Sequence, residues 1–449
     1  MYSQNGDETT IETIDGIEYT IHKYTTTGAN IFTPPVGVTR VDVLVVAGGG
    51  GGAGNTAYIG AGGGAGGAGG LIFKEGYTVT PGSAISLNVG VGGNGRNGLN
   101  TPADNGEATL FDGLTALGGG GGNITPGGET TNSPAADGGS GGGGRLNPAG
   151  SGLQEGSTDG GFGNDGARNS TDNGGGGGGG AGTQPSNITG NDGGDGGDGL
   201  DYSAFFGPSV GDAGFFAGGG GGGDNVGAQG LGGQGGGGDG SSAIPGNLIA
   251  PSTGMANTGG GDGGSVHAGA AGGSGTVIIR YINFDASDRV FNTSGNWDMA
   301  SNWFNGLLPD ATNNDVIIIA DPNIATNNNT SIGNLISPSY VTINIEDGIS
   351  INAIGNLNHA GQFTGDGEVT LNGTAAQTIS GGGSFENLRL DNLTTADIND
   401  PSDLFGVLYV DQGTLNTNGN LSLRCAFGTP PKTAQVGPVG GAIVGSVTT

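Results

Sequence analysis

The sequence predicts a mainly β protein, in which a β-scaffold carries packed polyglycine II helices and a parallel β-helix-like or sandwich module follows. Almost no α-helix is expected. Glycine accounts for 110 of the 449 residues and is concentrated between Gly48 and Gly275. Apolar segments of β-type composition flank these glycine tracts. After Tyr281 the chain becomes rich in Asn, Thr, Ile and Leu, with short strands expected about every ten to twelve residues.

The first segment is predicted to form antiparallel strands. β-rich runs cover residues 11–13, 17–24 and 31–33, and Asp15-Gly16 between two of them is a strong hairpin signal. Residues 41–47 form a buried strand that runs directly into glycine. Further strands are expected at residues 71–73, 77–80, 84–91, 108–111, 114–117 and 276–281. The β-segments at both ends can close one sheet, which the glycine tracts span.

The glycine tracts, such as residues 174–180, are predicted to be ordered. Polyproline II geometry has three residues per turn and directs its backbone groups outward. Because no Cβ separates them, glycine helices of this kind can lie side by side and pair N–H with C=O. Hydrogen bonds between the backbones of neighbouring helices then take the place of a hydrophobic core. Ala65 and Ala68 show the three-residue spacing.

The second half has the rhythm of a β-sandwich or a parallel β-helix. We favour the β-helix, because each short strand can form one face of a coil and Asn-rich corners can stack. Alternation at period two predicts which side chains point inward. These are Ile317, Ile319, Ile343, Ile345, Leu371, Leu388, Leu390, Leu408 and Leu421.

The composition shifts predict four parts. Residues 1–281 form a glycine-rich domain with its β-scaffold, and residues 282–288 form a linker. Residues 289–424 form the β-repeat module. Residues 425–449 are expected to begin a further module or to form a tail, which would make the chain a fragment of a longer protein.

The glycine-rich half resembles the glycine-rich domain of bacterial surface proteins and phage tail-fibre adhesins. The resemblance covers about residues 9–281. It rests on the ordered segments Val-Leu-Val-Val-Ala-Gly-Gly-Gly from Val43, Gly-Gly-Leu-Ile-Phe around Leu71, Val-Gly-Val-Gly-Gly from Val89, Leu-Thr-Ala-Leu-Gly-Gly from Leu114 and Gly-Thr-Val-Ile-Ile-Arg-Tyr from Gly275. It implies stacked polyglycine II helices on a β-scaffold, with variable loops for recognition.

The second half is similar to repeat modules of large secreted surface proteins from Bacteroidetes-type bacteria. The matching segments are Gly-Asn-Trp297, Ser-Asn-Trp303-Phe-Asn-Gly and residues 315–319, 361–373 and 413–423. Such modules are usually exported adhesins or structural proteins. The resemblance therefore implies a secreted or cell-surface location.

Charge and cysteine content exclude several classes of protein. The formal net charge of −29 argues against binding to nucleic acid or to an anionic membrane. Cys425 is the single cysteine, so an internal disulfide framework is excluded. No apolar run approaches the length of a membrane span. The start of the chain also lacks the basic-then-apolar layout of a signal peptide.

Calcium is the one cofactor that the sequence suggests. The acids Asp192, Asp195, Asp198 and Asp201 recur every three residues and would line one edge of a glycine helix. Carboxylate oxygens at short spacing suit Ca²⁺. The alternative is that these acids are simply solvated, because the tandem array of a calcium-binding nonapeptide repeat is missing.

Aromatic residues that interrupt the glycine are the candidate ligand-binding residues. Rings in loops either cover the packed backbone or contact a sugar or protein partner. Tyr58 and Phe162 belong to this group. The binding assignment rests on Tyr202, Phe205, Phe206, Phe215 and Phe216.

Other motifs give weaker signals. Residues 48–54 follow a strand with a glycine pattern like that of dinucleotide-binding folds, but no helix pattern follows. Trp297 and Trp303 are expected to cover the end of the β-helix, with a sugar platform as the alternative. Asp366 and Glu368 could form an acid/base pair, although a solvated turn is favoured.

The sequence therefore predicts a protein without catalytic activity, because no nucleophile, base and orienting group can be recognised together. The expected function is that of a surface adhesin or structural protein. It would bind a cell-surface glycan or protein receptor, or copies of itself in a surface assembly. The alternatives are the receptor-binding adhesin of a phage tail fibre and an ice-binding protein.

Overall fold

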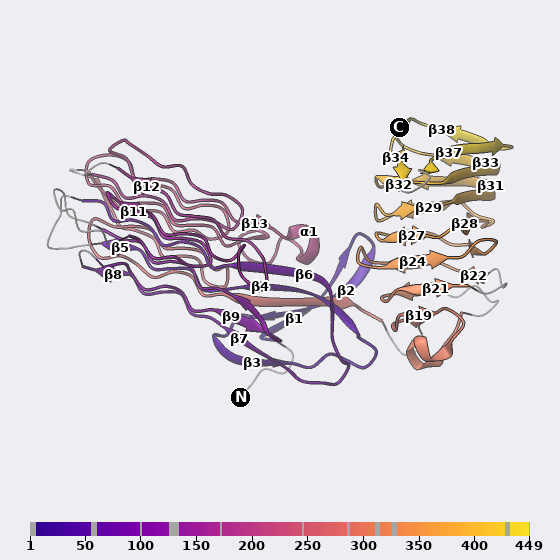
Figure 1. Ribbon diagram of the computed structural model, residues 1–449, viewed down its shortest axis with the longest axis horizontal. Coiled ribbons are helices and arrows are strands. Elements are labelled where there is room, and N and C mark those ends of the chain that lie inside the picture. The colour runs from indigo at the N-terminus through magenta and orange to yellow at the C-terminus, as the bar shows by residue number, and fades with distance from the viewer. Residues whose placement is uncertain are drawn as a thin grey trace.

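The computed structural model describes residues 6–54, 61–98, 101–124, 134–170, 173–244, 247–284, 288–309, 315–325, 330–426 and 432–448. The molecule is elongated, with a glycine-rich array at one end, two β-sheets in the middle and a β-solenoid at the other end (Figure 1). The predicted mainly β fold is confirmed. Helical structure within the described residues is limited to α1 (Ser203–Phe206), η1 (Ala300–Asn302) and η2 (Phe304–Gly306).

The scaffold of the glycine-rich domain consists of two antiparallel sheets. The first sheet has the order β1 (Glu8–Ile14), β2 (Ile17–Tyr24), β17 (Thr276–Ile282), β4 (Arg40–Val46) and β6 (Leu71–Thr78). The second has the order β10 (Leu114–Ala116), β9 (Thr109–Phe111), β7 (Ile85–Val89) and β3 (Gly28–Phe32). β17 lies between β2 and β4, so the two ends of the domain close one sheet, as predicted.

A hydrophobic core joins the two sheets, and a tight turn sets their first hairpin. Phe32, Val43 and Phe111 are fully or almost fully buried between the sheets. Asp15 and Gly16 have positive φ angles of 50° and 78° and connect Ile14 to Ile17. The predicted Asp-Gly hairpin is therefore confirmed.

The glycine tracts form an array of extended helices with a three-residue repeat. In residues 62–70 the amide N–H groups point in turn to three neighbouring segments. Gly62, Ala65 and Ala68 donate to residues 173, 176 and 179. The next positions donate to residues 265, 262 and 259, and the third set donates to residues 123, 120 and 117. Three further segments donate back to carbonyl groups of residues 63–70. This segment thus has six backbone-paired neighbours, which is the polyglycine II arrangement predicted from the sequence.

Short bridges and strands of two or three residues occur at the ends of these helices. The strands are β5 (Ala53–Gly54), β8 (Arg96–Asn97), β11 (Gly144–Arg145), β12 (Arg168–Asn169), β13 (Leu200–Asp201), β14 (Phe215–Phe216), β15 (Ser242–Ile244) and β16 (Asn247–Ile249). Figure 1 shows β5, β8, β11 and β12 at the end of the array that lies farthest from the solenoid.

Glycine is required in the array because neighbouring backbones lie where side chains would stand. A Cβ atom on Gly176 would lie 2.0 Å from the carbonyl oxygen of Ala167. A Cβ atom on Gly66 would lie 2.0 Å from the carbonyl oxygen of Gly50. Real Cβ atoms do not approach oxygen this closely. Alanine is accepted only at certain positions, such as the fully buried Ala65 and Ala68.

The second half is a parallel β-solenoid with three faces. The first face contains β18 (Arg289–Phe291), β20 (Val316–Ile318), β23 (Leu335–Ser337), β26 (Leu357–His359), β29 (Gln377–Ser380), the ends of β31 (Leu388–Ile398) and β33 (Val407–Asn416), and β38 (Ala442–Val444). The second contains β22 (Thr330–Ile332), β25 (Ser350–Ala353), β28 (Glu368–Leu371), the starts of β31 and β33, and β37 (Gln435–Val439). The third contains β19 (Gly295–Asn296), β21 (Pro322–Ile324), β24 (Thr342–Ile345), β27 (Gln362–Thr364), β30 (Ser384–Phe385), β32 (Ser402–Leu404), β34 (Leu421–Leu423) and β39 (Val447–Thr448).

Stacked polar residues hold the corners of successive coils together. The Oδ1 atom of Asp315 accepts the N–H of Asn334, whose own Oδ1 accepts the N–H of Asn356. The Oδ1 of Asn356 then accepts the N–H of Thr378. The predicted stacking of Asn-rich corners is confirmed. β35 (Cys425–Ala426) and β36 (Lys432–Thr433) form a separate antiparallel pair.

The end of the chain belongs to the same solenoid. β37 and β38 pair with β33, and β39 pairs with β34. Residues 435–448 therefore extend the existing faces by one coil. The structure gives no separate module or tail to these residues, which differs from the division predicted at residue 425.

Most residues predicted to point into the solenoid do so, but two point the other way. All of the predicted residues are buried. Ile317 and Ile319 pack against the glycine-rich domain, while Val316 and Ile318 fill the solenoid core. The period-two pattern does not determine which residues point inward here, because this strand is apolar on both faces.

The two halves are joined by a packed interface. Ile317 and Ile319 share one hydrophobic cluster with Leu44 and Ile278 of the scaffold sheet. Asn358 donates a 2.6 Å hydrogen bond to the carbonyl oxygen of Asp15. The sequence predicts a linker at residues 282–288 between two separate parts and gives no sign of this interface. The contacts imply that the first coils depend on the glycine-rich domain for part of their stability.

Substitution of one array glycine tests the packing. We expect Gly176→Ala to lower the free energy of unfolding by about 1–3 kcal/mol or more, because the new Cβ overlaps a backbone carbonyl. Gly190→Ala is the matched control, since nothing lies within 4 Å of its Cβ position. Chemical denaturation of both variants measures the difference. Equal stability of the two variants would contradict the close-packed array.

A buried carboxyl group predicts that the glycine-rich array loses folding stability at alkaline pH. Asp262 is fully buried, and its Oδ2 accepts the N–H of Gly52 at 2.9 Å. Burial raises the pKa of Asp262 to about 8, so the folded state favours the protonated acid. The contribution of protonated Asp262 to the free energy of unfolding is fully present below the pKa of this group in the unfolded chain. It is lost as pH rises through about 8.

We therefore expect Asp262→Asn to melt at a progressively higher temperature than the wild type as pH rises from about 4 to 9, a window that follows from linkage. Melting curves of the two proteins across this range provide the measurement. Because all other titrating groups are shared, their contributions cancel in the difference. A difference that does not change with pH would mean that Asp262 is ionised in the folded array.

Candidate functional site

The candidate ligand-binding residues lie on one loop, residues 201–216, which we call the aromatic loop. β13 pairs with β14 to close its ends, and α1 lies between them. Figure 1 shows α1 and β13 on the side of the array nearest the scaffold and solenoid, away from its distal end. The loop covers the outer surface of the first scaffold sheet, where the Phe73 ring lies 4.9 Å from that of Tyr202 and 4.6 Å from that of Phe205.

The aromatic residues of this loop divide into two groups. Tyr202, Phe206 and Phe216 are buried in the cluster over the sheet. These three rings cover the packed sheet in this structure, which is the capping alternative considered for them. Phe205 and Phe215 are half-buried and keep part of their surface accessible. Binding through Phe205 and Phe215 stays a prediction.

The remaining aromatic candidates are elsewhere. Phe162 is 46% exposed and forms an isolated bridge with Leu71. Tyr58 lies outside the described residues.

Arg280 fixes the aromatic loop to the sheet. Its Nε donates to Oδ2 of Asp42 at 2.8 Å, and both side chains are almost completely buried. Its Nη1 donates to the carbonyl oxygen of Phe205. The guanidinium also lies 4.3 Å from the ring centre of Tyr19 and 4.9 Å from that of Phe205. A buried ion pair that is broken on one side is costly, so Arg280 holds the loop in one position.

A hollow of about 250 Å³ lies beside this loop, where the sheet, the loop and the solenoid meet. Its lining includes Tyr19, Glu75, Phe205, Arg280, Pro338 and Asn358. We call it the junction hollow. Burial raises the pKa of Tyr19 to about 12, so its phenol stays protonated at neutral pH. The hollow combines aromatic surface, hydrogen-bonding groups and charges of both signs, which suits the binding of a small polar ligand.

Sequence reasoning identified Phe205 but missed Tyr19 and Arg280. Both are distant from Phe205 in the sequence, and the pairing of β2 with β17 places them side by side at the hollow. The single signal available was Arg280 itself, a cation inside the apolar strand Thr-Val-Ile-Ile-Arg-Tyr-Ile.

The predicted acidic edge exists, but its carboxylates already have partners. Oδ1 of Asp192, Asp195 and Asp198 accepts the N–H of Ala228, Leu231 and Gln234, respectively, at 2.8–2.9 Å. The following residues, Gly193, Gly196 and Gly199, donate back to the carbonyl oxygens of the same three residues. Each acid therefore replaces a missing carbonyl acceptor at the edge of the array.

Asp201 does not belong to this acidic edge. Its Oδ1 accepts the N–H of Ser203 at 2.8 Å, and that hydrogen bond lowers its pKa. Within the described ranges, no cluster of three or more Asp, Glu, His or Cys side chains is arranged to hold a metal ion. Calcium binding at these four aspartates stays a prediction.

The weaker sequence candidates are also explained by packing. Trp297 and Trp303 are buried in edge-to-face contact, and the indole N–H of Trp303 donates to the carbonyl oxygen of Trp297 at 2.6 Å. They cover the first coil, as expected. The amides of residues 48–53 donate to other segments of the array, so they are not directed at a phosphate.

Asp366 and Glu368 line one hollow on the solenoid, and the Glu368 carboxylate is bound by the Nε of Arg389 at 2.9 and 3.1 Å. A carboxylate held by a guanidinium is a poor general acid. This arrangement gives no support to the acid/base pair that was considered as an alternative.

Replacing one aspartate of the acidic edge tests the structural role of these carboxylates. Asp195→Ala leaves the N–H of Leu231 without its acceptor, and we expect a loss of about 1 kcal/mol in unfolding free energy. Asp195→Asn keeps an acceptor oxygen and should lose less. Denaturation of both variants in EDTA and in excess calcium makes the comparison. If calcium stabilises the wild type but neither variant, the acidic edge binds the ion instead.

Comparison with known proteins agrees with this architecture. No curated protein matches the chain. No helix in the described part of the chain is both long and apolar enough to cross a membrane. Residues 25–282 match the family model described as a glycine-rich domain, and this match covers more than half of the chain. The chain therefore belongs to the glycine-rich domain family.

Proposed function

We propose that this protein is a non-catalytic adhesin or structural protein of the cell surface, which binds a glycan or a protein receptor through the aromatic loop. The polyglycine array and the solenoid are both rigid, elongated structures, which suits a protein that holds a binding site away from a surface. The family resemblance of both halves supports export to that surface.

The observation that carries this proposal is the position of Phe205. Its backbone carbonyl is held by Arg280, while its half-buried ring lines the junction hollow. A ring fixed in this way loses little conformational entropy when a ligand binds, and so contributes more of its contact energy to affinity. The loop connects helices that are fixed by their own pairing, so its sequence can vary without loss of the array.

A double substitution tests the proposal. We expect Phe205→Ser with Phe215→Ser to abolish attachment to host cells while the midpoint of thermal unfolding stays close to that of the wild type. The predicted reason is that the two half-buried rings contribute more to binding than to the core. Phe162→Ser is the matched control, since it removes an exposed ring outside the loop.

The competing outcome is equally clear. A large drop in melting temperature, with attachment retained by the protein that still folds, would assign both rings to the core. The binding site would then lie elsewhere on the molecule.

A further inference from the structure

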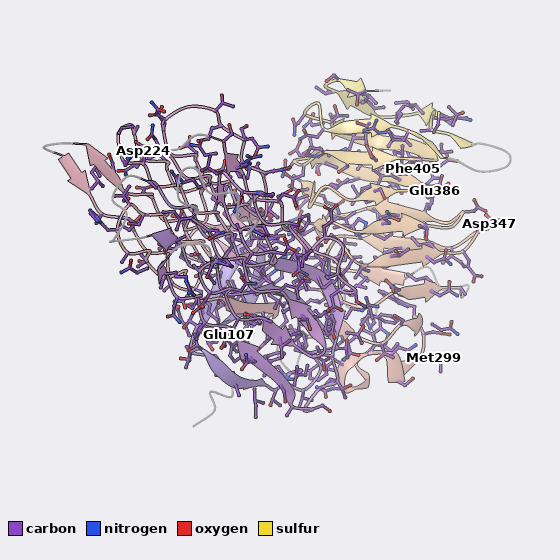
Figure 2. All side chains as sticks on the ribbon, turned by 60° about the vertical axis from the view of Figure 1, so that its left-hand side comes forward. Glu107, Asp224, Met299, Asp347, Glu386 and Phe405 are labelled. Atoms are coloured by element: carbon purple, nitrogen blue, oxygen red, sulfur yellow. The ribbon has the colours of Figure 1, made fainter. Side chains whose placement is uncertain are left out.

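A second hollow, on the solenoid, is distinct from the junction hollow. It has a volume of about 340 Å³ and is lined by Asp347, Ser350, Asp366, Glu368, Asn387 and Tyr409. We call it the solenoid groove. These residues lie at the starts of β25, β28, β31 and β33, on the second face. Figure 2 shows Asp347 at the edge of the solenoid that faces away from the glycine-rich domain.

The parallel register places equivalent side chains of successive coils in columns. Ser350 is paired with Glu368 in one column, and in the other Thr370 is paired with Arg389, which is paired with Tyr409. Adjacent strands lie about 4.8 Å apart, so equivalent side chains of successive coils repeat at that distance. The groove therefore presents hydrogen-bonding groups at a spacing close to the length of one pyranose ring. An extended saccharide that runs across the coils would meet hydrogen-bonding groups at each sugar residue, and the chemical type of these groups changes from coil to coil.

A network of fixed hydrogen bonds forms the wall of the groove. Arg389 donates from Nε to both Glu368 oxygens and from Nη1 to Asp411 at 2.6 Å, and its guanidinium lies 4.2 Å from the ring centre of Tyr409. Asn387 donates to the carbonyl oxygen of Gly367 at 2.9 Å and accepts the N–H of Val407 at 2.9 Å. These side chains are held in place before any ligand arrives, which lowers the entropic cost of binding.

We propose that the solenoid groove binds a neutral, hydroxyl-rich oligosaccharide. Its volume falls in the range of small-molecule sites. Carboxylates accept hydrogen bonds from hydroxyl groups, amide and guanidinium groups donate them, and Tyr409 adds an apolar surface. Three carboxylates line the groove, and the adjacent cation, Arg389, is shared between Glu368 and Asp411. An anionic saccharide is therefore disfavoured.

A blocking substitution tests this proposal on the full chain. Asp366 is an exposed residue on the wall of the groove, so Asp366→Trp is expected to fill it. Asp298→Trp, at an exposed acid outside the groove, is the control for the added ring and lost charge. The probes are neutral, amino and acidic oligosaccharides on an array, followed by titration calorimetry with those that bind. We expect a neutral oligosaccharide to bind the wild type and Asp298→Trp, and to bind Asp366→Trp at least about tenfold more weakly, a loss of about 1.4 kcal/mol.

Two further variants separate the possible outcomes. Asp366→Asn removes a charge without added bulk, so it weakens binding even if Asp366→Trp fails to fold. The Phe205→Ser/Phe215→Ser protein should bind the neutral saccharide normally, because its substitutions lie outside the groove. Absence of binding to every neutral oligosaccharide, binding to acidic ones alone, or unchanged affinity in Asp366→Trp and Asp366→Asn would overturn the proposal.

Discussion

The structure depends on the pairing of backbone groups between glycine helices. Residues 62–70 donate to three neighbouring segments and accept from three others, and a Cβ atom on most of these glycines would lie about 2 Å from a carbonyl carbon or oxygen of a neighbour. Buried amide and carbonyl groups are costly when unpaired, so the array forms only if its helices lie in register. Glycine has the highest entropic cost of folding, and the density of hydrogen bonds offsets that cost.

The same requirement explains much of the acidic composition. A helix at the edge of the array has amide groups that face no neighbouring carbonyl. Carboxylates fill this role at Asp192, Asp195 and Asp198, and also at Asp137 and Asp165, which accept the N–H groups of Ser151 and Gly152. Acids in this domain therefore serve as structural acceptors. This role follows from the geometry of the edge and requires no ligand.

The sequence predicted the fold well because it depends on local signals. The three-residue spacing, the Asp-Gly hairpin and the Asn-rich corners each have one physical interpretation, and the structure agrees with all three. The interface between the halves could not be predicted, because Ile317 and Ile319 look like ordinary core residues until their partners Leu44 and Ile278 are placed opposite them. The aromatic loop shows the same limit. Sequence alone does not separate Phe205, which lines a hollow, from Phe206, which is fully buried one residue later.

Amide hydrogen exchange of the native protein tests the central claim most directly. The pairing of these helices with their neighbours predicts slow exchange throughout residues 62–70 and at Gly175, Gly176, Gly178 and Gly179, with protection similar to that of β17 at the centre of the scaffold sheet. Gly156, which is exposed in a turn outside the glycine tracts, should exchange rapidly in the same sample. Rapid exchange across both glycine segments, with β17 still protected, would contradict an array held together by its backbone.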